Sequence, residues 1–254
     1  MSFNLIDHDT TNNLVVSTLK EAGIETPDLP TRKNLPTGKT TTADVVEAIR
    51  ASKSADPYTD PKVQKLYIAT QMQNAGGLYS TNQEAQAKEQ RQVLLEAKPR
   101  FKVELAERFG HAAQTVMDRA ELLGNFENLD EVRLNTDGAA KVHAAIEVQV
   151  AIEEIKKILD ARTKVELIDG RGSNHGGDTA IFEYANPTVE QRERINALGG
   201  ETIWNTARAG VELSMIGSSR EMSERVIAFQ HEHRRIQNIR EAEAKAKRAK
   251  IQVH

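Results

Sequence analysis

Cysteine is absent from this sequence of 254 residues. Without thiols, a chain cannot form disulfide bonds, thiolate-bound zinc sites or iron–sulfur clusters, and it has no cysteine nucleophile. Aromatic residues make up only 4% of the chain, and such residues usually supply much of the area that a thick core buries. We therefore expect a thin core. Few aromatic residues and many charged ones, at 28%, also favour helices over sheets.

Long apolar runs are missing as well. No stretch approaches the roughly 18 consecutive apolar residues that a membrane-spanning helix needs. The N-terminal residues lack the basic region and the apolar region of a secretory signal peptide. These absences predict a soluble protein that does not contact membranes and is either cytoplasmic (intracellular) or incorporated into a particle.

A phosphate-binding motif is present but incomplete. Residues 36–40 contain the Gly-Lys-Thr sequence that ends such a loop, in which the lysine and backbone amides neutralise phosphate oxygens. Lys33 stands where the loop needs its first glycine, and residues 28–32 do not form an apolar strand. A capped turn before a helix is the simpler interpretation, although nucleotide binding through Lys39 stays open as an alternative.

The histidines do not form a metal-binding motif. His231 and His233 are two positions apart, and side chains at that spacing face different directions on a helix. Arg235 occupies the position where a zincin motif needs its second histidine. The sequence has neither the Glu-x-x-His pairs of a di-iron bundle nor the Gly-x-Ser-x-Gly turn of a hydrolase. We therefore predict no metal site, no cofactor, no catalytic residue and no enzyme activity.

An apolar stripe between Gly138 and Arg162 is the strongest pattern that is present. Apolar residues recur there at spacings of three and four, which is the period of a helix. They are Val142, Ala145, Ile146, Val148, Val150, Ile152, Ile155, Ile158 and Leu159. The stripe covers more than a third of the helix circumference, so this helix needs partners on more than one side and should be central in a bundle.

A second long helix should run from Ser80 toward Gly124, with a bend or interruption near Pro99. Because a short reversal follows it, we expect the two long helices to form an antiparallel hairpin. A further helix is expected from Glu201 to Ile216. Capping residues mark other helix starts. They are Thr41 with Asp44, Asp60 before Pro61, and Thr188 with Gln191.

Four regions follow along the chain. Residues 1–79 should form an N-terminal arm of short helices with a Pro-rich linker, and residues 80–163 the long helical hairpin. Residues 164–187 show apolar segments on both sides of a Gly-rich stretch, which predicts a small β-hairpin with a projecting tip. Residues 188–254 should form C-terminal helices with a basic tail. The predicted fold class is thus all-α: an elongated antiparallel helical hairpin or bundle with one small β-hairpin.

Two segments are candidates for partner binding. Surface loops carry much specific recognition, so the Gly-rich tip should contact a neighbouring subunit through Arg171, Asn174 and His175. The last helix begins with an apolar two-heptad seam of the coiled-coil type, Met222 to Ile236. Beyond it the seam is lost, and this second half cannot bury itself alone. The basic residues of the tail are Arg234, Arg235, Arg240, Lys245, Lys247, Arg248 and Lys250.

These elements suggest a structural, assembly or adaptor protein. A Pro-rich arm, a projecting loop and an unburied terminal helix all gain order by contacting another subunit. We expect a homo-oligomer or a component of a multi-subunit complex, such as a virion or a comparable particle. The alternative is a nucleic-acid-binding protein whose C-terminal helix neutralises phosphates. Interleaved glutamates, and the lack of any aromatic residue after Phe229 for base stacking, weaken that alternative.

Overall fold

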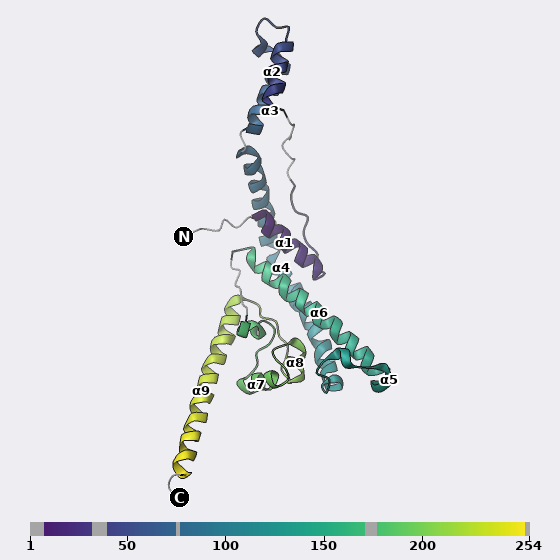
Figure 1. Ribbon diagram of the computed structural model, residues 1–254, viewed down its shortest axis with the longest axis vertical. Coiled ribbons are helices and arrows are strands. Elements are labelled where there is room, and N and C mark those ends of the chain that lie inside the picture. The colour runs from purple at the N-terminus through teal and green to yellow at the C-terminus, as the bar shows by residue number, and fades with distance from the viewer. Residues whose placement is uncertain (1–7, 32–39, 75–76, 171–176, 252–254) are drawn as a thin grey trace. The chain divides into compact units, whose positions relative to one another are not determined.

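The computed structural model describes residues 8–31, 40–74, 77–170 and 177–251, and most of them are helical (Figure 1). The chain divides into two compact units. Unit 1 comprises Met1–Asn13 and Pro27–Glu96, and unit 2 comprises Leu14–Thr26 and Ala97–His254. Two helices, α1 (His8–Glu21) and α4 (Gly77–Leu123), contribute residues to both units. None of the helices in the described ranges is both long and apolar enough to cross a membrane.

Unit 1 contains a pair of short helices that pack against each other. They are α2 (Thr42–Ala51) and α3 (Pro61–Asn74), with the 3-10 turn η1 (Pro57–Thr59) between them. The Ser52 hydroxyl donates to the Asp60 carboxylate at 2.8 Å. This bond ties the end of α2 to the start of α3.

The two predicted capping boxes are confirmed. Thr41 donates its backbone N–H to the Asp44 carboxylate at 2.6 Å and accepts from the Asp44 N–H at 3.3 Å. Thr188 and Gln191 make the same reciprocal pair at 2.8 and 3.2 Å, at the start of α7 (Val189–Ala197). Each box satisfies backbone N–H groups that a helix start otherwise leaves without partners.

Unit 2 is built on the long helical hairpin. The C-terminal part of α4 is followed by η2 (Leu129–Glu131), α5 (Leu134–Asp137) and α6 (Ala139–Leu167). Figure 1 shows α6 returning beside α4. α4 ends within one residue of its predicted end at Gly124, whereas α6 continues to Leu167, past its predicted end at Arg162.

Ion pairs establish that the hairpin is antiparallel. Lys98 pairs with Glu166 at 3.0 Å, Arg108 with Glu154 at 3.7 Å, and Arg119 with Glu147 at 2.9 Å. Residue numbers rise along α4 as they fall along α6, which is the register of antiparallel helices. The predicted hairpin is confirmed.

The core of unit 2 lies along this hairpin. Its fully buried side chains include Phe101, Leu105 and Val116 from α4 and Val148, Ile155 and Ile158 from α6. The described residues leave the other flank of the α6 stripe open to solvent, because Ile146 is 54% exposed and Val150 is 63% exposed. The prediction that α6 is covered on more than one side is therefore wrong for this flank.

The predicted β-hairpin at 164–187 is wrong. Lys164–Leu167 form the last turn of α6, and Gly177–Glu183 form the 3-10 segment η3. The reason lies in burial. Val165 and Ile168 are buried and three positions apart, which is a helical spacing, so the alternating residues 164–167 continue α6 instead of forming a strand. Within the described ranges, β pairing is limited to one antiparallel bridge, between Ala185 and Leu213.

The C-terminal region contains α7, α8 (Ile203–Arg208) and α9 (Ser219–Ile251). The prediction of one helix through Ile216 is wrong beyond Arg208. Gly210 adopts a positive φ of 73°, and its N–H bonds to the Ala207 carbonyl at 2.9 Å, which ends α8. The chain then runs extended past the bridge residue Leu213 to the start of α9.

Candidate interaction surface

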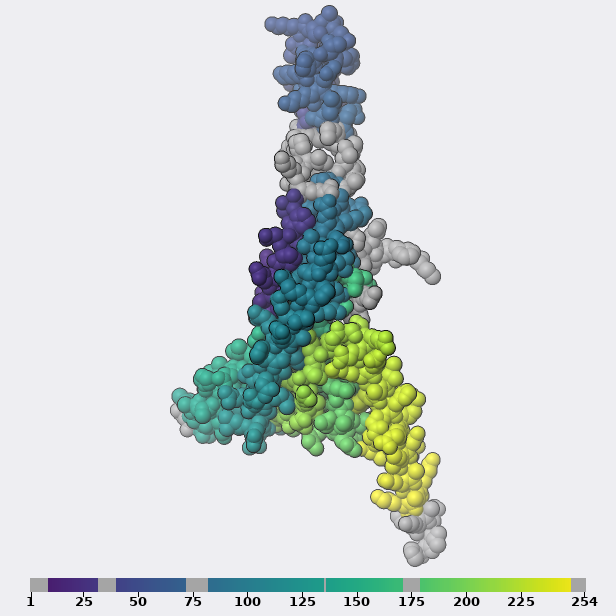
Figure 2. Space-filling view, turned by 180° about the vertical axis from the view of Figure 1, so that it is seen from behind, coloured from purple at the N-terminus to yellow at the C-terminus, as the bar shows by residue number. Residues whose placement is uncertain are grey.

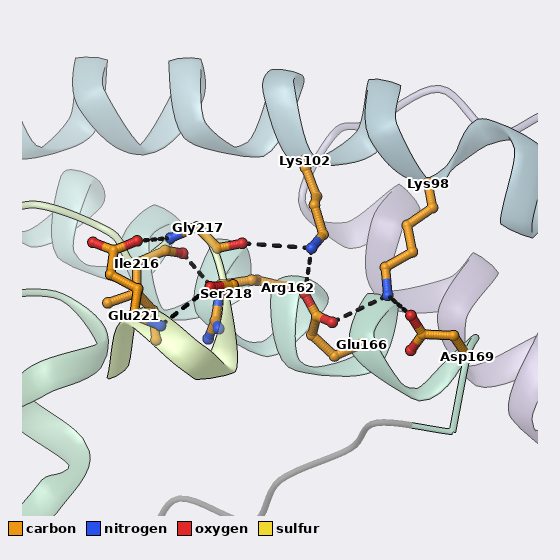
Figure 3. Close-up of polar contacts among 9 residues, drawn as sticks. All are labelled: Lys98, Lys102, Arg162, Glu166, Asp169, Ile216, Gly217, Ser218 and Glu221. Atoms are coloured by element: carbon orange, nitrogen blue, oxygen red, sulfur yellow. Dashed lines mark hydrogen bonds and ion pairs between the residues drawn. The ribbon is translucent and has the colours of Figure 1, made fainter. Parts of the chain in front are cut away.

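A cluster of charged side chains joins the helical hairpin to the start of α9 (Figure 3). Lys98 donates to both Glu166, at 3.0 Å, and Asp169, at 2.9 Å. Lys102 pairs with Glu166 at 2.7 Å and reaches the Gly217 carbonyl at 3.4 Å. Because Lys98 and Glu166 are buried, their charges need the partners that the cluster supplies.

The charges in this cluster stabilise one another. Burial alone would raise the pKa of Glu166, but hydrogen bonds and charges from Lys102 and Lys98 outweigh it and lower that pKa below its ordinary value. Glu166 is therefore a carboxylate at neutral pH. Its two lysine partners come from successive turns of α4, so the ion pairs fix the register of the hairpin at this end.

The segment before α9 is bound to the same cluster. Buried Arg162 donates from Nε to the Ile216 carbonyl at 3.1 Å. The Gly217 N–H donates to the Glu221 carboxylate at 2.8 Å, and Ser218 accepts from the Glu221 N–H at 3.2 Å. The last of these bonds caps the start of α9. The start of α9 is thus held by charged and polar contacts on both sides.

A groove of about 1060 Å³ lies where α9 passes α7 and η3. Phe182 and Phe229 meet edge to face, with their ring centroids 5.3 Å apart. The Arg192 guanidinium lies 5.5 Å from the Phe182 ring centre and 5.0 Å from that of Phe229. Arg192 also forms an ion pair with Glu201. Aromatic and cation–π contacts of this kind hold the first half of α9 in place.

The apolar seam predicted for the first half of α9 packs against other parts of the chain, but it does not form a coiled coil. Met222 is buried, and Val226 and Phe229 are half-buried. The neighbours of α9 in the described part of the chain are the short elements η3 and α7 rather than a second long helix. His233 stacks on Phe229 with a centroid distance of 6.0 Å and stays exposed.

Arg240 marks the end of the packed part of α9. Its guanidinium forms a two-pronged ion pair with Glu193 of α7, at 2.6 and 3.0 Å. Hydrogen bonds from Arg240 lower the pKa of Glu193. We call residues 241–251 the distal segment of α9. All side chains described in it, Glu241 to Lys247, are exposed. On the face shown in Figure 2, the yellow part of this segment extends past the green α7–α8 region.

Some of the predicted partner-binding residues have described side chains and others do not. Arg234, Arg235, Arg240, Lys245 and Lys247 are exposed on α9, and Arg235 pairs with Glu232 of the same helix at 2.7 Å. The backbone at 248 and 250 is helical, but the side chains of Arg248 and Lys250 lie outside the described residues. Arg171, Asn174 and His175 of the Gly-rich tip, and Lys39 of the incomplete phosphate motif, also lie outside them.

Sequence reasoning missed the residues that position α9. Lys98 and Glu166 are 68 residues apart, and Arg240 and Glu193 are 47 apart. No short motif joins such pairs. Lys98 and Glu166 could have been paired only if the register of the two helices were known, because their opposite charges on facing helices are the one signal that the sequence offers.

Among the described residues, no group of three or more His, Asp or Glu side chains is placed to hold a metal ion. No model of a protein family matches the sequence. No curated protein and no solved structure matches the chain either. The geometry of α9 and of the hairpin is therefore the basis for inferring a function.

Proposed function

We propose that the chain is a non-enzymatic structural or adaptor protein that assembles with other subunits, including copies of itself, through the distal segment of α9. A component of a virion or a comparable particle would use such a segment. One observation carries the proposal: Glu241–Lys247 is helical although every side chain in it is exposed. A helix that packs on none of the other described residues is available to pack on another molecule.

The charge pattern explains how this segment keeps its helix before docking. Glu241 precedes Lys245 by four residues, and Glu243 precedes Lys247 by four. Each pair in this orientation stabilises a helix by about 0.2–0.5 kcal/mol. Basic residues near a helix C-terminus also interact favourably with the helix dipole. A preformed helix loses less conformational entropy on binding than a disordered tail does.

The same segment carries a narrow seam for a partner. Ile239, which is 46% exposed, is followed by Ala242 and Ala246 at spacings of three and four. Small side chains at this spacing let another helix approach closely, and the flanking lysines favour an acidic neighbour. The function is thus helix docking onto an acidic protein surface.

Ion pairs within the chain favour a protein partner over nucleic acid. Glu193 and Glu232 already neutralise Arg240 and Arg235. Phosphate binding would have to compete with both pairs, whereas docking of the distal segment leaves them in place. Nucleic-acid binding through α9 is therefore the alternative to docking on a protein.

The test compares the full chain with a chain truncated after Arg240. Light scattering during size-exclusion chromatography should give assemblies larger than a dimer for the full chain and smaller species for the truncated one. Equal masses for both chains at every concentration would overturn the proposal. A salt-dependent affinity for DNA or RNA that disappears on truncation would instead establish the alternative. Removal of only residues 252–254 serves as the control for shortening the chain.

A further inference from the structure

The hairpin of unit 2 has an exposed apolar face of its own. Ile146 and Val150 are exposed large aliphatic side chains one turn apart on α6. Leu122 of α4 is 44% exposed. It lies two helical turns after Thr115 and therefore on the same side of α4. A depression of about 490 Å³ lies beside Ile146 and Val150, with buried Ala151 among its lining residues. These residues form one surface between α4 and α6, which we call the hairpin face.

The shape of the hairpin face suits a packed helix. Ile146 and Val150 form an i, i+4 ridge, and the small side chains of Ala112 and Ala151 leave a groove next to it. Ridges of this spacing pack into the grooves of a second helix. A further depression of about 530 Å³, on the other side of Val150, reaches Gly23 after α1. The ridge therefore stands between two hollows.

The charges on the hairpin face are divided between its edges. Arg108 and Arg119 lie on the α4 edge, and Glu154 and Glu147 lie opposite them on the α6 edge. One such Arg–Glu pair stands at each end of the apolar ridge. All four side chains are at least one-third exposed, so they can interact with a second molecule as well as with each other.

We propose that a second copy of this chain packs on the hairpin face to form a four-helix bundle. A two-fold axis parallel to the helices places α4 of one copy on α6 of the other, so that the basic edge meets the acidic edge twice. All neighbouring helices are then antiparallel, as in up-down bundles, and the interface is isologous. His111 and Glu153 extend the two edges, whereas Asp118 and Lys157 have the opposite sign to their own edge.

Charge complementarity selects a second copy over other occupants. A uniformly acidic or basic partner would satisfy one edge and be repelled by the other, but a rotated copy satisfies both. The size fits a weak dimer. Residues 21–26 lie beside the hairpin from Arg100 to Arg108, so the open stretch runs from Arg108 to Leu122, about 20 Å at 1.5 Å per residue, and two helices are about 20 Å wide. The face then buries about 400 Å² per copy, below the usual size of a stable interface.

This inference deepens the proposed function and rests on it only in requiring self-association. It also accounts for the broad apolar stripe of α6. The width of that stripe predicts packing on two sides of α6, and the described residues of the chain cover one of them. The second copy would cover Ile146 and Val150 and leave the distal segment of α9 free for larger assemblies.

The first test replaces the ridge with charge. In Ile146→Glu and Val150→Glu, an unpaired carboxylate would be buried at the centre of the interface, so the dimer Kd should rise at least about 30-fold. Analytical ultracentrifugation measures it. Because both positions are exposed in the single chain, unfolding curves should change little. Val103→Glu is the matched control, since Val103 is 57% exposed on α4 but lines neither depression of the hairpin face, and it should leave the Kd unchanged.

A second measurement uses the absence of cysteine from the chain. A mixture of Thr115→Cys and Val150→Cys chains should form disulfide-linked heterodimers under mild oxidation, because the bundle places α4 of one copy on α6 of the other. Thr163→Cys, one helix turn or more beyond the face, should not cross-link with Thr115→Cys to the same extent.

The outcomes separate this inference from the proposed function. A dimer that survives truncation after Arg240 and is lost in Val150→Glu supports the inference. Self-association that is lost on truncation but unchanged in Ile146→Glu and Val150→Glu overturns the inference and supports docking by α9. A chain that is monomeric at every concentration overturns both.

Discussion

Lys98 and Glu166 form a 3.0 Å ion pair in which the two side chains are only 10% and 9% exposed. This contact joins α4 to the last turn of α6, at the end of the hairpin away from its connection, and Lys102 and Asp169 complete its charge balance. Buried ion pairs contribute little net stability when intact, but loss of one partner leaves an uncompensated charge. The pair is therefore the most sensitive point of unit 2.

Replacement of Lys98 should destabilise unit 2 strongly. Lys98→Met keeps the aliphatic length but removes the ammonium group that pairs with buried Glu166 and with Asp169, which should cost about 3 kcal/mol. Urea unfolding followed by circular dichroism measures the loss. Lys156→Met, at an exposed pair with Glu153, should change stability by less than about 1 kcal/mol. Equal effects of the two substitutions would contradict the role given to the buried pair.

Stability of unit 2 should fall in acid through Glu166. Its pKa is lowered in the folded chain, so the unfolded state binds the proton more tightly. The contribution is fully present above the unfolded value of about 4.3 and is lost as pH falls through the lowered folded value. In Glu166→Gln the slope of stability against pH below about 4.3 should therefore be shallower. Unfolding curves between neutral and strongly acidic pH test this, and exposed Glu212→Gln should keep the original slope.

Local signals in the sequence predicted helix starts well. A capping box needs only residues three apart, so Thr41 with Asp44 and Thr188 with Gln191 were visible without the fold. The hairpin of α4 and α6 followed from two long apolar periodicities and a short reversal. Non-local pairs could not be predicted, because a shift of one turn between α4 and α6 would give Lys98 a different partner.

The wrong predictions came from short patterns. Val165 and Leu167 alternate with polar neighbours over four residues, and so short a stretch fits a strand or the end of a helix. Burial of Ala161, Val165 and Ile168 along one side of α6 decided for the helix. At Gly210, a single residue of positive φ ended a helix whose apolar pattern continued. In the first place tertiary packing outweighed the local pattern, and in the second a glycine at the helix C-terminus outweighed the apolar periodicity.

The aromatic contacts of the groove should determine how firmly α9 is held. Phe229→Ala removes the ring that Phe182 and Arg192 contact, and because Phe229 is only half-buried the cost should be about 2 kcal/mol, below that of a core phenylalanine. Hydrogen exchange of the amides between Met222 and Arg240 should become faster. Ile227→Ala, at an exposed position on the same helix, is the control. Unchanged protection in Phe229→Ala would show that the charged cluster and the Arg240–Glu193 ion pair hold α9 without this ring.

The ion pair between Arg240 and Glu193 should be weak but specific. Both side chains are about half exposed, so water and salt screen the pair, and each single charge reversal, Arg240→Glu or Glu193→Arg, should lower stability only slightly. The double reversal restores opposite charges and should recover much of that loss. A double-mutant cycle at low and high salt measures the coupling, which should shrink as salt rises. Because the pair is the last contact of α9 with α7, the single reversals should also speed hydrogen exchange near residue 240 while leaving Met222 protected. A coupling energy of zero at low salt would mean that the packed part of α9 ends earlier, at the Phe229 contacts, and that the docking segment is correspondingly longer.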